Sequence, residues 1–124
     1  MGKSTRAAQR LIVAAGLCLA SQAAPAAEGQ CYLSVERRVY LDGRCNIILR
    51  SDGSFSIGAG DQSRSPYFAY VNMAEGQARA SWNRVPNSNH ADSNLGIVTR
   101  EGGCWVNSHA KVCAWRPGTR PKTF

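Results

Sequence analysis

The sequence has few side chains that could carry out catalysis or bind a metal ion. It contains only two histidines, His90 and His109, among 124 residues. It also lacks a glycine-rich loop between a strand and a helix, which is the motif typical of a nucleotide site. Once the cysteines pair, no cluster of metal-ligating residues remains at a regular spacing. We therefore expect neither a cofactor nor a metal.

Charge of one sign is not concentrated in any part of the chain either. The sequence has 15 basic and 8 acidic residues, and its arginines are scattered among the acids, with Arg37 and Arg38 as an adjacent pair. Nucleic-acid-binding tails carry their basic residues in blocks. The pattern predicts a mixed, moderately basic surface, with no strong indication of nucleic-acid binding.

Long apolar segments are absent as well, apart from one near the beginning of the chain. Residues 1–26 have a basic start, an apolar run over 11–20 and small residues near the end. This order is typical of a secretory signal peptide and predicts cleavage between Ala26 and Ala27. The apolar run is too short to span a membrane, which takes about 20 residues. We expect no membrane span, and a mature protein that is periplasmic or secreted.

Cleavage would leave one small domain. Removing residues 1–26 from 124 leaves 98 residues with a net charge of +4, because the leader holds three basic residues and no acidic one. A domain of this size lies near the lower limit of what buries a sufficient core unaided. We expect a single domain over 27–116 and a flexible tail over 117–124, which contains Pro117 and Pro121.

Four of the five cysteines lie in the predicted mature chain, since only Cys18 belongs to the leader. An even number of cysteines in an exported chain indicates disulfides. The local pairing joins Cys31 to Cys45 and Cys104 to Cys113, and the alternative joins Cys31 to Cys113 and Cys45 to Cys104. We favour the local pairing because each bridge would close one hairpin, stabilising the fold by about 2.5–3 kcal/mol.

Alternating apolar residues and regularly spaced turn formers predict a series of short strands. Turns are expected at Asp42-Gly43, at 51–54 and at 74–76, and a terminal hairpin is expected over 104–115. No segment has the apolar stripe of a helix. The sequence therefore predicts an all-β fold, a small antiparallel barrel or sandwich stapled by two disulfides.

A polar segment over 84–94, which contains Pro86, predicts an exposed loop. Such loops on a stapled scaffold commonly carry binding function. Tyr70 and Trp82 lie at strand ends that lead into the loop, and aromatic side chains often anchor interfaces. Trp105, by contrast, is expected to cover the disulfide of its hairpin. The predicted binding residues are Tyr70, Trp82, Arg84, Asn87, Asn89 and His90.

A catalytic interpretation remains beside the binding one. His90 and Asp92 lie two residues apart, so the carboxylate could orient the imidazole in a small secreted hydrolase. Together with His109 and Lys111, they are the side chains that acid–base cleavage of RNA requires. A purely structural role in the cell envelope is a third hypothesis.

Two sequence motifs flank the last two cysteines, GCWVN over 103–107 and VCAW over 112–115. With YFAYV over 67–71, this pattern resembles small exported uncharacterised proteins of alphaproteobacteria, and the resemblance implies no function. The chain is more distantly similar to periplasmic lysozyme inhibitors, which are also small, exported, disulfide-stapled β-barrels, although no motif matches theirs residue by residue. We expect an exported, non-enzymatic binding or inhibitor-like module whose partner is an envelope or host macromolecule.

Overall fold

The computed structural model describes residues 26–61 and 64–124. The predicted signal peptide lies outside the described residues, apart from Ala26. The described residues form eight strands, and among them there is no helix long and apolar enough to cross a membrane. The strands are β1 (Ala26–Val35), β2 (Arg38–Leu49), β3 (Phe55–Ile57), β4 (Ala69–Ala74), β5 (Gln77–Trp82), β6 (Ser93–Glu101), β7 (Cys104–Val106) and β8 (Ala110–Trp115).

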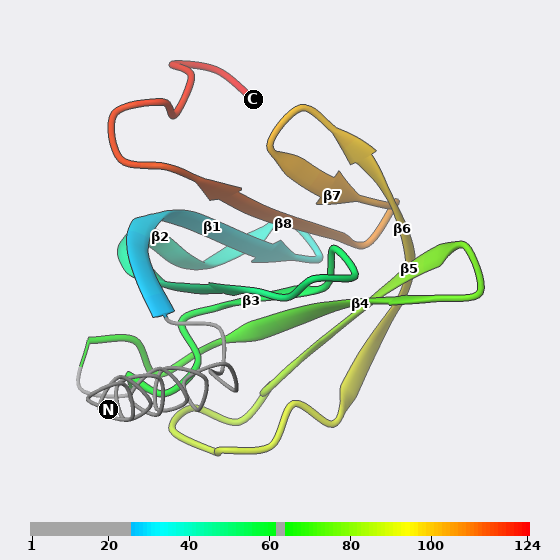
Figure 1. Cartoon of the computed structure of the whole chain (residues 1–124). Coiled ribbons are helices and arrows are strands. Elements are labelled where there is room, and N and C mark those ends of the chain that lie inside the picture. The colour runs from blue at the N-terminus through cyan, green and yellow to red at the C-terminus, as the bar shows by residue number, and fades with distance from the viewer. Residues whose placement is uncertain (1–25, 62–63) are drawn as a thin grey trace, which may run out of the picture.

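The strands close into one antiparallel barrel. Each strand pairs with its neighbour in the chain, and β1 also pairs with β8, from Gln30 opposite Trp115 to Val35 opposite Ala110. Figure 1 shows the strands wrapped around a common interior. The predicted all-β fold with two disulfides is confirmed, and of the two predicted architectures the structure has the barrel.

The apolar residues form strands because their alternation lets one side of each strand face the interior. In β1, Cys31, Leu33 and Val35 are buried, whereas Tyr32 and Ser34 between them are only half-buried. Eight strands enclose an interior just wide enough to be filled by side chains. The core is accordingly a packed one, whose largest fully buried members include Leu33, Ile57, Val71 and Val112.

The first hairpin does not turn where the sequence predicts. The turn lies at Glu36 and Arg37, which both have positive φ angles, 50° and 69°. Asp42 and Gly43 instead lie within β2, opposite Tyr32 and Cys31 of β1. The prediction of a turn at Asp42-Gly43 is therefore wrong. Pairing along the whole of β1 extends β2 through this turn-forming sequence, and glycine tolerates the φ of 141° found there.

The other predicted hairpins are present. A tight turn near Gly53 joins β2 to β3, and Glu75 and Gly76 join β4 to β5 with φ angles of 52° and 77°. The terminal hairpin consists of β7 and β8, in which Cys104 lies directly opposite Cys113.

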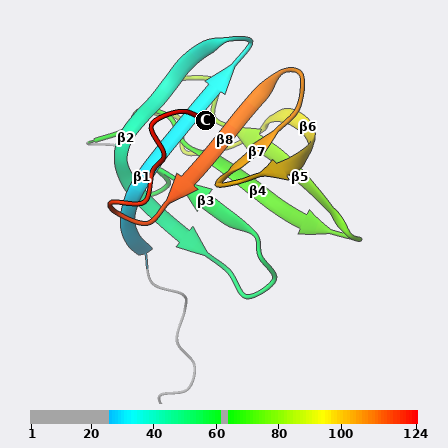
Figure 2. The same cartoon turned by 90° about the horizontal axis from the view of Figure 1, so that it is seen from above.

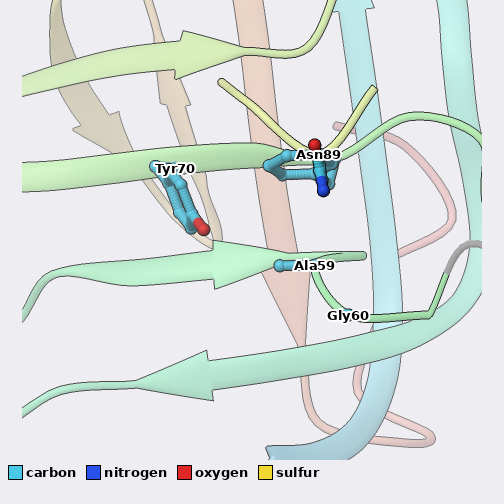
Figure 3. A pocket seen from close by; sticks show the side chains of 5 residues that line it. Ala59, Gly60, Tyr70 and Asn89 are labelled. Carbon is cyan, nitrogen blue, oxygen red and sulfur yellow. The ribbon is translucent and has the colours of Figure 1, made fainter. Parts of the chain in front are cut away.

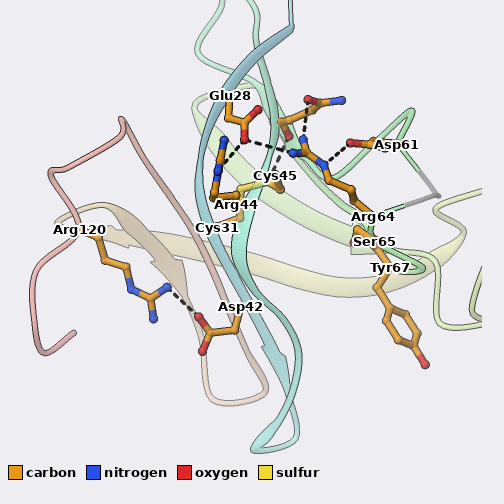
Figure 4. Close-up of a disulfide and its surroundings, with 11 residues drawn as sticks. Glu28, Cys31, Asp42, Arg44, Cys45, Asp61, Arg64, Ser65, Tyr67 and Arg120 are labelled. Atoms are coloured by element: carbon orange, nitrogen blue, oxygen red, sulfur yellow. Dashed lines mark hydrogen bonds and ion pairs between the residues drawn. A yellow bond between two sulfur atoms is a disulfide. The ribbon is translucent and has the colours of Figure 1, made fainter.

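Both disulfides follow the local pairing, which is confirmed. Cys31 is bonded to Cys45 with the Cα atoms 6.0 Å apart, and Cys104 to Cys113 with the Cα atoms 4.0 Å apart. The first bridge joins β1 to β2 and belongs to the barrel core (Figure 4). The second belongs to a separate apolar cluster with Trp115. Each bridge therefore ties together strands that are already neighbours.

Trp115, and not Trp105, packs with the second disulfide. Trp115 is 7% exposed and shares a cluster with Cys104 and Cys113, whereas Trp105 packs against the barrel core. The prediction for Trp105 is wrong because adjacent residues of a strand face opposite sides of the sheet. Gly103 makes room for the indole, since a Cβ atom there would clash with Nε1 of Trp115.

The segment that the sequence predicts as a flexible tail lies across β1 and β8 (Figure 2). The ring of Phe124 is 4.9 Å from that of Tyr32 and 4.8 Å from that of Trp115, measured between centroids. The Arg120 guanidinium lies over the Trp115 and Phe124 rings and forms an ion pair of 2.7 Å with Asp42. The tail is therefore the outer layer of the second apolar cluster.

Candidate functional site

The two ends of the barrel differ in the length of their connections. We call loop end the one formed by residues 36–37, 58–61, 64–68, 83–92 and 107–109, which connect β1 to β2, β3 to β4, β5 to β6 and β7 to β8. We call turn end the opposite one, formed by residues 50–54, 75–76 and 102–103 and the start of the tail at 116. The loop end carries the predicted binding loop, and we take it as the candidate site.

A hollow of about 660 Å³ opens at the loop end. Three of the predicted site residues line it, namely Trp82, Arg84 and His109. Glu36 and Asn94, which the sequence analysis does not single out for function, also contribute to its wall. The structure thus brings together residues from β1, β5, β6 and the terminal hairpin that are far apart in the sequence.

The floor of this hollow is aromatic. Trp82 packs against Tyr40 and Tyr67, with ring centroids 4.6 and 5.8 Å away, and these two tyrosines are 5.0 Å from each other. Trp82 itself is only 4% exposed. Its main contribution is therefore to close the core at this end, and a partner would contact its surroundings more than its ring.

A buried asparagine holds the binding loop in place. Asn83 is fully buried, and its Oδ1 accepts a hydrogen bond of 2.7 Å from the backbone N–H of Phe68. Its Nδ2 donates to the carbonyl oxygens of Pro66 at 2.9 Å, Ser88 at 3.0 Å and Val85 at 3.4 Å. One side chain therefore joins the 83–92 loop at two places to the segment that leads into β4.

The loop that Asn83 holds is itself exposed. Arg84 and Pro86 are exposed, and Val85 is 65% exposed, which is high for an apolar side chain. Asn87 has a φ of 66°, and its backbone N–H donates to the carbonyl of Pro66 at 2.9 Å. The segment presents its side chains to solvent while its backbone is bonded at several points.

A second asparagine fixes the neighbouring turn. Oδ1 of Asn107 accepts hydrogen bonds of 2.8 Å from the backbone N–H groups of His109 and Ala110. Its Nδ2 donates to the carbonyl oxygens of Leu95 at 2.8 Å and Ile97 at 3.0 Å in β6. This side chain links the terminal hairpin to β6 beyond the end of the short β7, and it positions His109 beside the hollow.

His109 pairs with Glu36, a residue 73 positions away in the sequence. Its Nδ1 lies 2.9 Å from Oε2 of Glu36, and the two side chains are 62% and 69% exposed. A contact between two side chains that are this exposed contributes little to stability. The pair therefore provides a polar, solvent-accessible edge to the hollow.

The other predicted catalytic residues are not joined to this pair. In the part of the chain that the structure describes, no hydrogen bond or ion pair links His90 to Asp92, and both are exposed. The backbone N–H of His90 donates to Oγ of Ser88 at 3.3 Å. The ammonium of Lys111 lies 5.4 Å from the ring centroid of Phe124, at the tail. The four residues do not form one hydrogen-bonded group.

Two predicted binding residues line a smaller pocket beside the loop. This pocket, of about 260 Å³, lies between Tyr70 of β4, Asn89 of the loop and the segment at Ala59 and Gly60 (Figure 3). Phe68 packs edge-on against Tyr70, with the ring centroids 5.6 Å apart. Of the six predicted binding residues, Trp82 and Arg84 thus line the hollow and Tyr70 and Asn89 line this pocket, whereas Asn87 and His90 line neither.

Charged residues hold the base of the segment that Asn83 binds. Arg64 bonds to Asp61 at 2.7 Å and to Glu28 of β1 at 3.1 Å, and Arg44 of β2 reaches the same Glu28 at 2.8 Å (Figure 4). Hydrogen bonds from Arg64 and then Arg44 hold the pKa of Glu28 below its ordinary value. The bonds to Asp61 and Glu28 raise the pKa of Arg64.

No family model matches the chain. No curated protein and no solved structure matches it either. Within residues 26–61 and 64–124, no three His, Cys, Asp or Glu side chains gather closely enough to hold a metal ion. The function has therefore to be argued from the geometry of the loop end.

Neither of the two asparagines that shape this end is among the site residues predicted from the sequence. Asn83 and Asn107 each follow a strand and precede a turn, where an asparagine side chain commonly bonds to nearby backbone groups. This position is the signal that could have found them. Their partners in distant segments, such as Phe68 and Leu95, depend on the closed barrel.

Proposed function

We propose that the protein is an exported, non-enzymatic binding or inhibitor-like module of the cell envelope, which holds a partner macromolecule with the 83–92 loop. The observation that carries this proposal is the buried Asn83, which fixes an exposed loop through four side-chain hydrogen bonds. The two disulfides support export, because such bonds persist in oxidising compartments.

A loop that is already ordered loses little conformational entropy when it binds. Ordering each mobile side chain at an interface costs about 0.5–1.5 kcal/mol, and mobile loops cost more. Here the backbone is held by Asn83 and by the bond from Asn87 to Pro66. The loop backbone therefore costs little entropy on binding, and the exposed side chains supply the contacts to a partner.

Arg84 and Val85 are the side chains best placed to act as anchors. Arginine is enriched among the interface residues that contribute most to binding free energy. Burying the exposed apolar side chain of Val85 against a partner would also favour binding. Arg84 also lines the hollow, so a partner that covers Val85 can reach the polar edge formed by His109 and Glu36. We expect the contact to spread from the loop onto the rim of the hollow.

The test is photo-crosslinking in the envelope of the cells that produce the protein. A photoreactive residue at Val85 should give one saturable crosslinked species, identified by mass spectrometry, because this position lies in the binding loop. The same residue at Ile97, which is 42% exposed on β6, is the matched control and should not give that species. Arg84→Ala should weaken the Val85 crosslink.

Equal crosslinking from Val85 and Ile97, or none from Val85, would exclude the loop as the binding surface. The hydrolase alternative is separated by assaying RNA, peptidoglycan and ester substrates with the wild type and His90→Ala. Turnover that depends on His90 would replace the binding proposal with the catalytic one.

A further inference from the structure

The turn end of the barrel has a hollow of its own, which the binding loop does not reach. Its volume is about 740 Å³, within the range of roughly 300–1,000 Å³ typical of small-molecule sites. The wall is mainly apolar and comes from five strands, with Leu49 of β2, Phe55 of β3, Met73 of β4, Trp105 of β7 and Trp115 of β8. We call it the turn-end hollow.

The apolar wall is open to solvent at its rim. Leu49 is 62% exposed, and Met73 and Trp105 are half-buried. Covering exposed apolar groups of this kind with a ligand removes them from water, which favours binding. Met73 has a flexible side chain that can adapt to the shape of an apolar ligand. The wall therefore suits an aliphatic chain.

The charged groups of the turn-end hollow are all cationic. Arg100 and Arg116 line it, and no acidic residue of the described part of the chain does. Neither arginine forms an ion pair with a described residue, in contrast to Arg44, Arg64 and Arg120, which each bond to a carboxylate. The hollow thus combines an apolar wall with guanidinium groups that lack an anionic partner.

Arg100 is oriented by its neighbours. Its Nε donates to the carbonyl of Gly102 at 3.0 Å, and its guanidinium lies 6.0 Å from the ring centroid of Trp105. A guanidinium carries five N–H donors in a planar arrangement, so the bond to Gly102 leaves donors for an anion. The acids at this end, Asp52, Glu75 and Glu101, are not part of the lining.

We infer that the turn-end hollow binds a single-chain anionic amphiphile, with the aliphatic chain against Phe55, Met73 and Trp105 and the anionic head group at Arg100 and Arg116. This site is independent of the proposed partner at the loop end, because the two hollows share no lining residue. The tail supplies Arg116 and Thr119 to the rim, so its packing against the barrel helps to form the site.

The test is a titration of the folded, oxidised protein with dodecanoate below its micellar concentration, followed by tryptophan fluorescence and backbone amide NMR shifts. The wild type should bind one dodecanoate saturably, with shifts at the turn end. Arg100→Gln and Arg116→Gln should each weaken binding about tenfold, because each removes a charge-assisted hydrogen bond. Dodecanol, which has the same chain without the charge, should bind more weakly than dodecanoate.

Arg79→Gln is the matched control, since Arg79 is exposed on β5 and does not line the hollow. It should bind dodecanoate like the wild type. The inference is overturned if dodecanoate does not saturate, if Arg79→Gln weakens binding as much as Arg100→Gln, or if the shifts lie at the loop end. Equal affinity for dodecanol, or binding only to phosphatidylglycerol vesicles, would also overturn it.

Discussion

Replacing Asn83 by alanine should destabilise the protein by about 3–4 kcal/mol. Three of its side-chain hydrogen bonds have lengths of 2.7 to 3.0 Å, and each such bond contributes about 1 kcal/mol net. Phe68 is 3% exposed, so its N–H would lose its acceptor without gaining water, which adds at least about 1 kcal/mol. The total is a large part of the roughly 5–15 kcal/mol that stabilises a small domain.

Urea unfolding of the oxidised wild type and Asn83→Ala measures this loss. Asn72→Ala is the control, because Asn72 is exposed on β4 and its side chain has no hydrogen bond to a described residue. It should change stability by less than about 0.5 kcal/mol. Amide hydrogen exchange should speed up at Asn87, whose N–H is held by Pro66 in the native loop. A loss below about 1 kcal/mol, with exchange at Asn87 unchanged, would refute the idea that Asn83 fixes the loop.

Three further predictions concern the disulfides, the tail and the charge network. Replacing Cys104 and Cys113 together by serine should cost about 2–4 kcal/mol and reduce the near-ultraviolet circular dichroism of the Trp115 cluster; unchanged urea stability would contradict this. Phe124→Ala should cost about 1–2 kcal/mol because it removes two aromatic contacts, and an unchanged melting temperature would mean that the tail does not stabilise the barrel. Because the pKa of Glu28 is lowered in the folded protein, its ion pairs add stability at pH values above the ordinary pKa of 4.5, and this stability is lost as the pH falls through the lowered pKa. Glu28→Gln should remove that part of the pH dependence of stability, measured by urea unfolding at several pH values. An unchanged pH profile would contradict the assignment.

The strands and most hairpins could be predicted because their signals are local. Alternating burial in β1 and the turn at Glu75-Gly76 follow from a few neighbouring residues. The sequence left a barrel and a sandwich as alternatives, because closure depends on β1 meeting β8 at the other end of the chain. The prediction of a turn at Asp42-Gly43 is wrong for the same reason. The local turn signal is weaker than the pairing of β2 along the whole of β1.

The candidate site could likewise be predicted only where its signals are local. The exposed loop could be predicted from its polar composition, and Arg84 and His109 do reach the same hollow. The contact between His109 and Glu36 spans 73 residues, and no spacing in the sequence indicates it. The role of Asn83 also depends on Phe68, which only the folded β4 and β5 bring near.

The tail covers the place where β1 pairs with β8 and closes the barrel. Both disulfides join strands within a hairpin, so no covalent bond closes the sheet between β1 and β8. If the pairing between β1 and β8 opened, each of these strands would become an unpaired edge. Such edges can pair with strands of another copy of the chain and start aggregation. The tail leaves β8 and contacts Tyr32 of β1 and Asp42 of β2. It thereby links the two sides of the β1–β8 pairing, which neither disulfide joins. Chains shortened before Arg120 should for this reason exchange strands and aggregate more readily, even where their hairpins remain intact.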